Sequence, residues 1–419
     1  MQAKGDFPAF RALEASPIGR TPMRRVLTLI ATASVLSACA SSERPGPSVG
    51  PMQPETAVAF SLQPGAFNDI PDWTTVDLAP ALLAFRRACD GRRQRDPSAA
   101  LPGGGQYGGT VADWQPACAA AQSVAPGSER AFFEANFIPN LVRGPGEARI
   151  TAYYEPIIEA RRFPDAVYSA PLVRKPGDMV TVDIAAFAEA YDNEALRGAP
   201  RALTGQLNGA QVRPYPKREE INPSTDQVFA WAHPVDVYNL QIQGSGRIAF
   251  PDGTQARAAF AAQNGYRWRS ALGALRDSGQ LQGGATWQNF RAWSDRNGAD
   301  ATRQALNADP SFVFFQEEGI DDPAAGPRGA AGVPLTPMGS IAVDPAFHPY
   351  GAVVFVDAQY DGQPFRHLFV AQDTGGAIRR GPQRGDVFFG SGADAGRGAE
   401  RMNSPARWWT LIPRSVPTS

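Results

Sequence analysis

Histidine is scarce in this sequence, and none lies at a spacing that would hold a catalytic metal. The 419-residue chain has only three, His233, His348 and His367, and none belongs to a His-x-x-x-His or Glu-x-x-His pair. Catalytic zinc sites take their histidine ligands at such fixed intervals. We therefore expect no metal centre and no other cofactor.

The motifs of two large enzyme classes are also missing. No Gly-x-x-x-x-Gly-Lys-Ser/Thr loop is present, so nucleotide hydrolysis has no support. Residues 243–246, Gln-Gly-Ser-Gly, supply only part of the Gly-x-Ser-x-Gly elbow of serine hydrolases. The 40 basic and 41 acidic residues give a formal net charge of −1, which provides no general attraction for a polyanion. A nucleic-acid partner is not expected.

The apolar run near the N-terminus is too short to cross a membrane and is typical of an export signal. Met23 is the favoured start, and two arginines and an apolar stretch over 26–35 follow it. A membrane-spanning helix takes roughly 20 apolar residues. Residues 36–39, Leu-Ser-Ala-Cys, resemble a lipoprotein signal, in which the cysteine is acylated after cleavage. We predict that residues 1–39 are such a signal and that Cys39 carries the lipid; an ordinary secretory signal with a chance cysteine is the alternative.

The segment after Cys39 indicates where the protein resides. Ala40 stands where an aspartate would resemble an inner-membrane retention signal, so the resemblance implies an outer-membrane lipoprotein facing the periplasm. Residues 40–62 are rich in Ser, Pro and Gly, which is typical of a flexible tether. The membrane is therefore an expected partner, contacted through the lipid anchor.

Two further cysteines, Cys89 and Cys118, each lie near an expected helix. An exported protein meets conditions that permit a disulfide, and we predict that the two are paired. Spacing alone also allows two buried free thiols, because geometry decides whether two cysteines can be bridged. Neither cysteine has a neighbouring histidine, which argues against a thiol nucleophile.

The remaining pattern predicts a mainly β fold. The 42 glycines and 38 prolines favour turns and short strands over long helices. Helical patterns are confined to residues 79–89, 114–120, 128–137, with Ser128 as the N-cap, and parts of 263–307. Strands are expected at 150–156, 228–231, 237–243, 312–315, 340–343, 352–356, 367–370, 386–389 and 408–412. The last six, separated by Gly/Pro turns, suggest a small closed barrel, since closure removes exposed strand edges.

Two aspartates beside glycines are the candidates for chemistry. Asp373 follows one expected strand and Asp386 begins another. An acid held against the apolar residues 387–389 would be partly desolvated, which raises its pKa and keeps it protonated for donation to a leaving group. Aspartates beside glycines also commonly serve turns, and position alone leaves that interpretation open.

Four segments in one order carry a family resemblance. Residues 153–156 (Tyr-Tyr-Glu-Pro), 240–247 (Leu-Gln-Ile-Gln-Gly-Ser-Gly-Arg), 332–344 and the block 373–390 together resemble the membrane-bound lytic transglycosylase A family, over roughly residues 60–413. The resemblance implies a double-psi β-barrel domain formed by 63–156 plus 317–415, with a β-rich domain of 157–316 inserted and a groove for the glycan between them. It also implies that Asp386 is the catalytic acid and Asp373 its supporting acid, although the linker 379–385 is slightly long for the family.

The implied reaction needs only one acid. An ordinary glycosidase uses two carboxylates, one of which activates water or attacks the sugar. In a lytic transglycosylase the C6 hydroxyl of the muramic acid attacks its own anomeric carbon, so the nucleophile is already tethered. One residue can protonate the leaving oxygen and then accept the hydroxyl proton. The expected function is cleavage of the MurNAc-GlcNAc β-1,4 bond in peptidoglycan, with 1,6-anhydroMurNAc ends.

Polar and aromatic side chains suited to sugar lie in two of the four segments. Amides and hydroxyls bond sugar hydroxyls, and aromatic faces cover sugar rings, so we predict that the glycan strand contacts Tyr153, Tyr154, Gln241, Gln243 and Ser245. On a strand, Gln241 and Gln243 would share one face. We expect structural roles for the three nearby carboxylates Glu155, Asp236 and Asp344.

Two other functions compete with this hypothesis. An expansin-like module would bind wall glycans on the same barrel without cutting them, because a fold does not fix an activity. An aspartic protease would use the triplet 373–375 (Asp-Thr-Gly) with 277–279 (Asp-Ser-Gly). The second triplet ends a helical pattern, whereas a protease needs two carboxylates that share a proton.

Overall fold

The computed structural model describes residues 59–92, 95–101, 107–200, 202–378 and 381–417. The predicted signal, Cys39 and most of the predicted tether lie outside the described residues. Within them, no helix is long and apolar enough to cross a membrane. The described residues form one compact unit.

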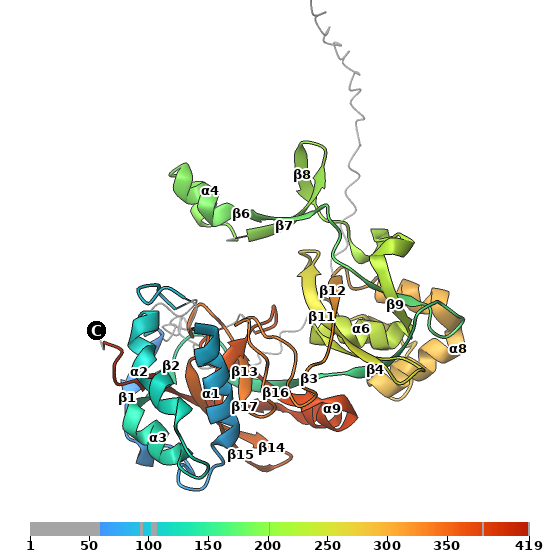
Figure 1. Ribbon diagram of the computed structural model, residues 1–419. Coiled ribbons are helices and arrows are strands. Elements are labelled where there is room, and N and C mark those ends of the chain that lie inside the picture. Colours follow the sequence, from blue (N-terminus) through green and yellow to red (C-terminus); the bar gives the residue numbers. More distant parts are fainter. Residues whose placement is uncertain (1–58, 93–94, 102–106, 201, 379–380, 418–419) are drawn as a thin grey trace, which may run out of the picture. The chain divides into compact units, whose positions relative to one another are not determined.

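The largest sheet has nine strands and draws on both ends of the described chain (Figure 1). Its order is β1 (Ser61–Pro64), β2 (Phe137–Arg143), β18 (Arg407–Pro413), β14 (Val353–Tyr360), β15 (Gln363–Asp373), β13 (Ser340–Val343), β16 (Arg384–Ser391), β3 (Arg149–Glu155) and β17 (Asn403–Pro405). β13 and β15 are parallel, as are β16 and β3, whereas the other neighbours are antiparallel. Parallel neighbours cannot be joined by a tight hairpin, so β3 and β16 come from distant parts of the sequence.

Three helices cover the core of this sheet. They are α1 (Ala79–Arg92), α2 (Val111–Gln122) and α3 (Glu129–Asn136). Their buried aromatics include Phe85, Trp114 and Phe133, which belong to the same core as Trp408 of β18. Ser128 does precede α3, but its side chain makes no capping hydrogen bond, contrary to the capping role predicted for it.

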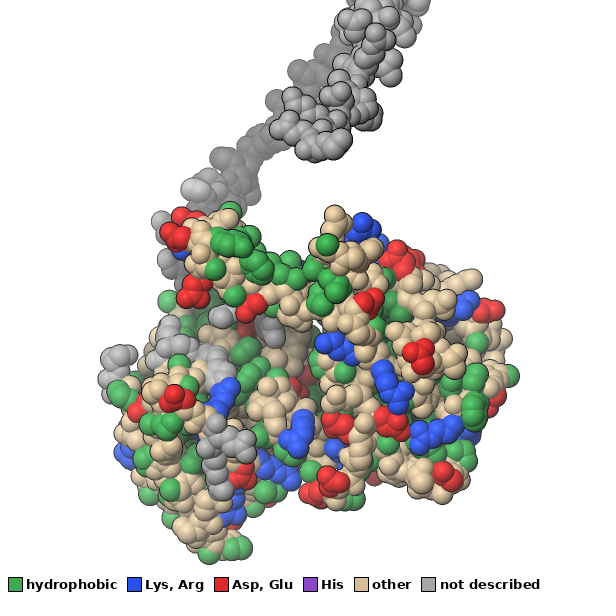
Figure 2. Space-filling model, turned by 45° about the horizontal axis from the view of Figure 1, so that its top comes forward, with side chains coloured by type: hydrophobic (Ala, Val, Ile, Leu, Met, Phe, Trp, Pro, Cys, Tyr) green, Lys and Arg blue, Asp and Glu red, His purple; other side chains and the backbone are tan. Residues whose placement is uncertain are grey.

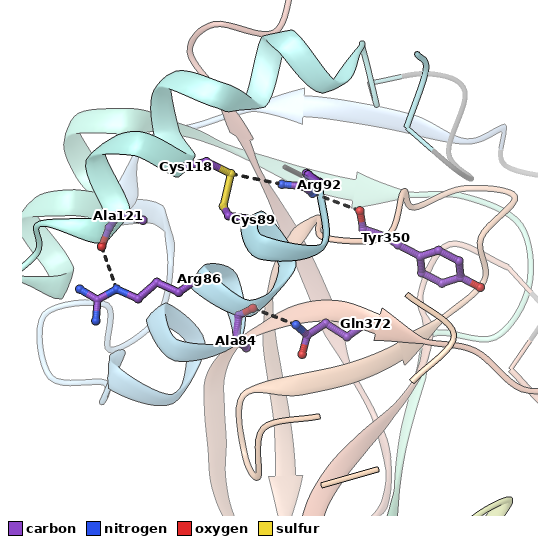
Figure 3. Close-up of a disulfide and its surroundings, with 8 residues drawn as sticks. All are labelled: Ala84, Arg86, Cys89, Arg92, Cys118, Ala121, Tyr350 and Gln372. Carbon is purple, nitrogen blue, oxygen red and sulfur yellow. Dashed lines mark hydrogen bonds between the residues drawn. A yellow bond between two sulfur atoms is a disulfide. The ribbon is translucent and has the colours of Figure 1, made fainter. Parts of the chain in front are cut away.

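The disulfide between Cys89 and Cys118 is formed and joins α1 to α2 (Figure 3). The Cα atoms lie 5.5 Å apart, so the prediction of a pair is confirmed and the alternative of free thiols is excluded. Arg92 lies beside the sulfur atoms, donates to the Tyr350 carbonyl at 3.1 Å and covers the Trp114 ring. Together these contacts fix the ends of two helices against the barrel.

A second sheet of six strands is formed by the middle of the chain. Its order is β12 (Val313–Glu318), β11 (Gln255–Gln263), β10 (Gly246–Ala249), β4 (Ile157–Arg161), β9 (Val228–Ala232) and β5 (Ala170–Val173). The strand predicted at 312–315 therefore belongs to this sheet and not to the barrel sheet. Two short helical turns, η2 (Arg218–Glu220) and η3 (Thr225–Gln227), precede β9.

A three-stranded sheet and two short helices lie between β5 and η2 in the sequence. The strands are β6 (Met179–Asp183), β7 (Ala202–Asn208) and β8 (Gln211–Pro214), and the helices are α4 (Ile184–Ala190) and α5 (Glu194–Arg197). On the face shown in Figure 2, blue and red side chains are interspersed over the surface. That mixture agrees with the formal net charge of −1.

The strand predicted at 237–243 is wrong, because this segment is the helix α6 (Pro234–Gln243). Proline occupies the first helical turn, His233 caps it by accepting from the Val235 N–H, and Gly244 ends it with φ of 86°. Val235 and Tyr238 of this helix pack with α7 (Ala271–Asp277) and α8 (Trp287–Leu306) in a separate core. Val237 and Leu240 pack instead in the core of the six-stranded sheet. β-branched and aromatic residues favour a strand locally, but tertiary packing can override this propensity.

Candidate active site

Two side chains on one face of strand β3 donate hydrogen bonds to the two candidate acids. Thr151 and Tyr153 are two residues apart and therefore point to the same side of the strand. The Thr151 hydroxyl donates to Asp386 Oδ1 at 2.5 Å, and the Tyr153 hydroxyl donates to Asp373 Oδ2 at 2.8 Å. Asp386 lies directly beside Thr151 in the parallel pairing of β16 with β3.

The two acids flank a third strand. Ala342 of β13 is paired with Asp386 on one side and with Asp373 on the other. Neighbouring strands are about 4.8 Å apart, which places the two acids' Cα atoms roughly 10 Å from each other. Gly385 allows this packing, because a Cβ there would lie 2.5 Å from the Trp408 ring.

Asp386 is suited to hold a proton in mildly acidic solution, well above the pH at which an ordinary aspartate loses it. Burial raises its pKa to about 6, although the Thr151 hydroxyl and the Arg384 guanidinium oppose the rise. Its side chain nevertheless remains partly accessible. A carboxyl group with these properties can donate a proton and take one back.

Asp373, in contrast, already accepts three hydrogen bonds. Its Oδ1 accepts from the Ala330 and Thr374 N–H groups, each at 2.9 Å, and its Oδ2 accepts from Tyr153. Burial raises the pKa of Asp373, and these bonds oppose the rise. The preceding residue, Gln372, donates to the Ala84 carbonyl of α1 at 2.8 Å (Figure 3). Asp373 is thus held by its neighbours and has little capacity to activate a water or attack a sugar.

A cavity of about 390 Å³ lies beside β3 and the start of β17, and Asp386 itself is not among its lining residues. Thr151 lines this cavity, and its hydroxyl is the group that donates to Asp386. The other lining residues come from β3, α6, α7, α8, α9 (Gly392–Arg401) and the segments beside them, and include aromatic, apolar and amide side chains: Ala152, Tyr154, Tyr238, Ile242, Gln243, Trp268, Ser270, Leu272, Trp287, Ala399, Glu400, Met402 and Asn403. Trp268 is 52% exposed, so its ring presents an open aromatic surface.

The cavity contains two of the five predicted glycan contacts. Tyr154 and Gln243 line it, and the Tyr154 hydroxyl accepts from Asn239 at 2.8 Å. The Gln243 side chain accepts from the Tyr154 N–H at 3.3 Å, which ties α6 to β3. Both are placed where they can contact a ligand.

The other three predicted contacts lie elsewhere. Gln241 is buried, accepts from Arg218 at 2.7 Å and donates to the Val313 carbonyl, so its predicted role in the groove is wrong. Helical geometry turns it away from Gln243. Ser245 is also buried and accepts from the Phe260 N–H at 3.0 Å, which indicates a structural role. Tyr153 supports Asp373 and does not line the cavity.

Sequence reasoning missed Thr151 and Trp268. Thr151 could have been found from period two along β3, since it lies on the face of Tyr153. Trp268 gave no comparable signal, because it lies in a loop before α7 and reaches the cavity only through tertiary packing. Thr374 was passed over too: its buried hydroxyl has no hydrogen-bond partner among the described residues.

The carboxylates expected to be structural are all bonded within the protein. Asp236 forms an ion pair with Arg291 at 2.6 Å, and Asp344 accepts from two backbone N–H groups. The protease hypothesis finds no support, because Asp277 ends α7, is largely exposed and pairs with Arg276. Within the described residues, no group of three or more His, Cys, Asp or Glu side chains is arranged to hold a metal.

Comparison with known proteins agrees with this architecture. Residues 149–316 match the MltA specific insert domain, and residues 339–412 match the 3D domain. The membrane-bound lytic murein transglycosylase of Escherichia coli K12 is 29% identical over 279 residues, which are 64% of this chain and 66% of that protein. The aligned part is thus just under two thirds of that relative's length.

Solved structures cover more of the chain. The membrane-bound lytic murein transglycosylase from Agrobacterium tumefaciens is 31% identical, with a TM-score of 0.69 over 84% of this chain and 98% of that one. MltA from Neisseria gonorrhoeae is 26% identical, with a TM-score of 0.69 over 86% and 92%. The predicted mainly β fold, with a double-psi barrel and a second β-rich part, is confirmed. The chain belongs to the membrane-bound lytic murein transglycosylase A family.

Proposed function

We propose that this protein is a lytic transglycosylase that cleaves the MurNAc-GlcNAc β-1,4 bond of peptidoglycan and leaves 1,6-anhydroMurNAc ends. The observation that carries the proposal is Asp386, a partly accessible acid with a pKa of about 6, held by a threonine that lines a sugar-sized cavity. Family membership supports the same chemistry.

The reaction proceeds through a single proton carrier. Protonated Asp386 donates its proton to the glycosidic oxygen, and the bond between that oxygen and the muramic C1 breaks. The Asp386 carboxylate then accepts the proton of the C6 hydroxyl as O6 bonds to C1. Protons balance, no water is consumed and the acid is regenerated. Asp373 has no separate chemical step, because its oxygens already accept three hydrogen bonds; it orients Tyr153 and the loop of Ala330.

Glycan binding is assigned to the cavity beside Thr151. Aromatic rings cover the apolar faces of sugars, and Trp268, Trp287 and Tyr154 supply such rings. Trp268→Ala should raise KM with little change in kcat or folding, because the ring is half exposed and forms no part of a core cluster. Phe163→Ala, which removes an 81% exposed ring outside the cavity, is the matched control. An unchanged KM for Trp268→Ala would remove this ring from the binding site.

We also propose attachment to the outer membrane through an acylated Cys39, with the catalytic part facing the periplasm. The membrane-bound relatives and the residues 36–39 support an envelope location. The chain would pass from the barrel domain to the insert domain at Pro156 and return near residue 317. A tether of residues 40–62 would then allow both domains to reach glycan strands.

One product analysis distinguishes the candidate functions. Purified protein is incubated with sacculi and the released muropeptides are examined by mass spectrometry. Anhydro ends support the proposal, whereas ordinary reducing ends would make the enzyme a hydrolase. Retention on sacculi without any release would instead favour an expansin-like binding module.

A further inference from the structure

A buried ionic cluster joins β3 to the six-stranded sheet. Glu155, the last residue of β3, is completely buried. Its Oε2 accepts from Arg247 of β10 at 2.8 Å, and its Oε1 accepts from Arg257 of β11 at 2.7 Å. Both arginines are themselves buried. The Ser391 hydroxyl, at the end of β16, also donates to Glu155 at 2.5 Å.

The cluster is an unfavourable arrangement unless all its members are present. Arg247 and Arg257 lie directly opposite each other on antiparallel strands, where like charges repel. Glu155 between them supplies the opposite charge. Buried ion pairs commonly contribute little net stability, because desolvation offsets the attraction, yet removing one partner leaves an uncompensated charge. Such a cluster therefore fixes one arrangement of the strands that carry it and adds little to the free energy of unfolding.

Three supports of the two acids, Thr151, Tyr153 and the Ala330 N–H, lie on segments that this cluster holds. Glu155, Tyr153 and Thr151 follow one another at period two on one face of β3. Ser391 lies five residues after Asp386 on β16. The guanidinium groups also donate to the carbonyls of the loop 319–339: Arg247 to Pro323 at 2.8 Å and Arg257 to Ala325 at 3.0 Å. The same loop supplies the Ala330 N–H that bonds Asp373.

We propose that Arg247 and Arg257 are positioning residues for the acid pair, which hold β3, the end of β16 and the loop 319–339 in the register that places Asp386 and Asp373. Neither arginine touches the cavity beside Thr151. Their effect passes through Glu155 and Ser391. The inference rests on the proposed function for its kinetic readout only.

The test compares buried arginines in the full chain. Arg257→Met should lower kcat by about 10- to 100-fold, because a displacement of about 1 Å in a catalytic group has effects of that size. KM should change less than kcat, since most of the residues that line the cavity lie outside β3. Arg257→Lys should recover part of kcat, because lysine keeps the charge but cannot bond Glu155 and Ala325 in the same planar geometry. Arg92→Met, which removes a buried arginine of α1, is the control and should keep wild-type kcat.

A second readout is independent of turnover. Carboxyl NMR of Asp386 should show a raised pKa in Arg257→Met, because the displaced strand loses the Thr151 hydrogen bond that holds this pKa down. Arg384 and Asp373, the charged groups that also act on Asp386, are both retained in the sequence of the variant. Thr151→Val gives the reference shift.

The outcomes separate the two proposals. A folded Arg257→Met protein with wild-type kcat and an unchanged pKa at Asp386 overturns the positioning role, and a lowered melting temperature alone would mean that the cluster is structural. If this variant does not fold, Ser391→Ala removes only the hydroxyl that donates to Glu155 and accepts from Arg247, and it should still lower kcat. Wild-type kcat in both Ser391→Ala and Arg257→Lys would equally overturn the positioning role. A wild-type protein that forms no anhydro ends contradicts the proposed function, while the NMR shift still tests the cluster.

Discussion

Replacing Asp386 by Asn should abolish turnover while leaving the fold and glycan binding intact. The amide is nearly isosteric with the carboxyl group, and its oxygen can still accept from Thr151. It cannot deliver a proton to the leaving oxygen. Loss of one general acid commonly lowers the rate by about 10²–10⁴-fold. We expect the upper end of this range or more, because Asp386 serves both proton transfers.

The pH dependence of the wild type follows from the same group. The first step requires protonated Asp386, whose pKa is about 6. Activity should therefore fall as pH rises through about 6, the value at which half of the carboxyl groups are ionised. The rate of anhydromuropeptide release from sacculi, measured from pH 4.5 to pH 8, is the assay.

Asp386→Asn should also stabilise the folded protein, relative to wild type, at high pH. Because the folded-state pKa is raised from the ordinary value of 3.8 to about 6, ionisation of Asp386 opposes folding once pH exceeds the lower value. The full effect, reached above the higher value, is about 3 kcal/mol, and partial exposure reduces it to roughly 1–3 kcal/mol. Asp386→Asn should thus melt at a higher temperature than wild type at pH 8 and at a similar temperature below pH 4.

Two results would refute this reasoning. A folded Asp386→Asn protein that still forms anhydro ends at a rate near wild type would remove Asp386 from the proton transfers. A variant that melts lower than wild type at pH 8 would show that the charged carboxylate is favoured in the fold, contrary to its burial. Binding to sacculi at low temperature serves as the control that the cavity beside Thr151 is intact.

The remaining predictions concern the second acid, the anchor and the disulfide. Asp373→Asn should reduce the rate of anhydromuropeptide release less than Asp386→Asn, since one amide oxygen can keep the two backbone hydrogen bonds; an equal loss in a protein with an unchanged melting curve would give Asp373 a chemical step. Cys39→Ser should move the protein from the membrane fraction to the soluble periplasm, and retention in membranes would contradict the lipid anchor. Thiol titration of the unreduced, denatured protein should find Cys89 and Cys118 unreactive, and replacing both with Ala should lower the free energy of unfolding by about 2–4 kcal/mol; two free thiols would contradict the pair.

Local sequence was enough to predict the chemistry and several elements. Asp386 and Asp373 stood out because each lies where an apolar strand meets glycines, and the order of four segments indicated the family. Helix α1 and the strands around residue 353 were predictable from apolar periodicity, since the buried face of each repeats at the period of its own backbone. The lipoprotein signal proposed at residues 36–39 rests likewise on a local pattern.

What surrounds the acids was decided only by tertiary structure. The Thr151–Asp386 bond joins residues 235 positions apart, and the parallel pairing of β3 with β16 that brings them together has no local signature. The same holds for the Glu155 cluster, whose partners lie on three other strands. Gln241 was misplaced because seven residues of mixed polarity fit either a strand or one side of a helix. Proline at 234 and glycine at 244 favour the helix, and hydrogen bonds with Arg218 and the Val313 carbonyl hold this amide in the interior.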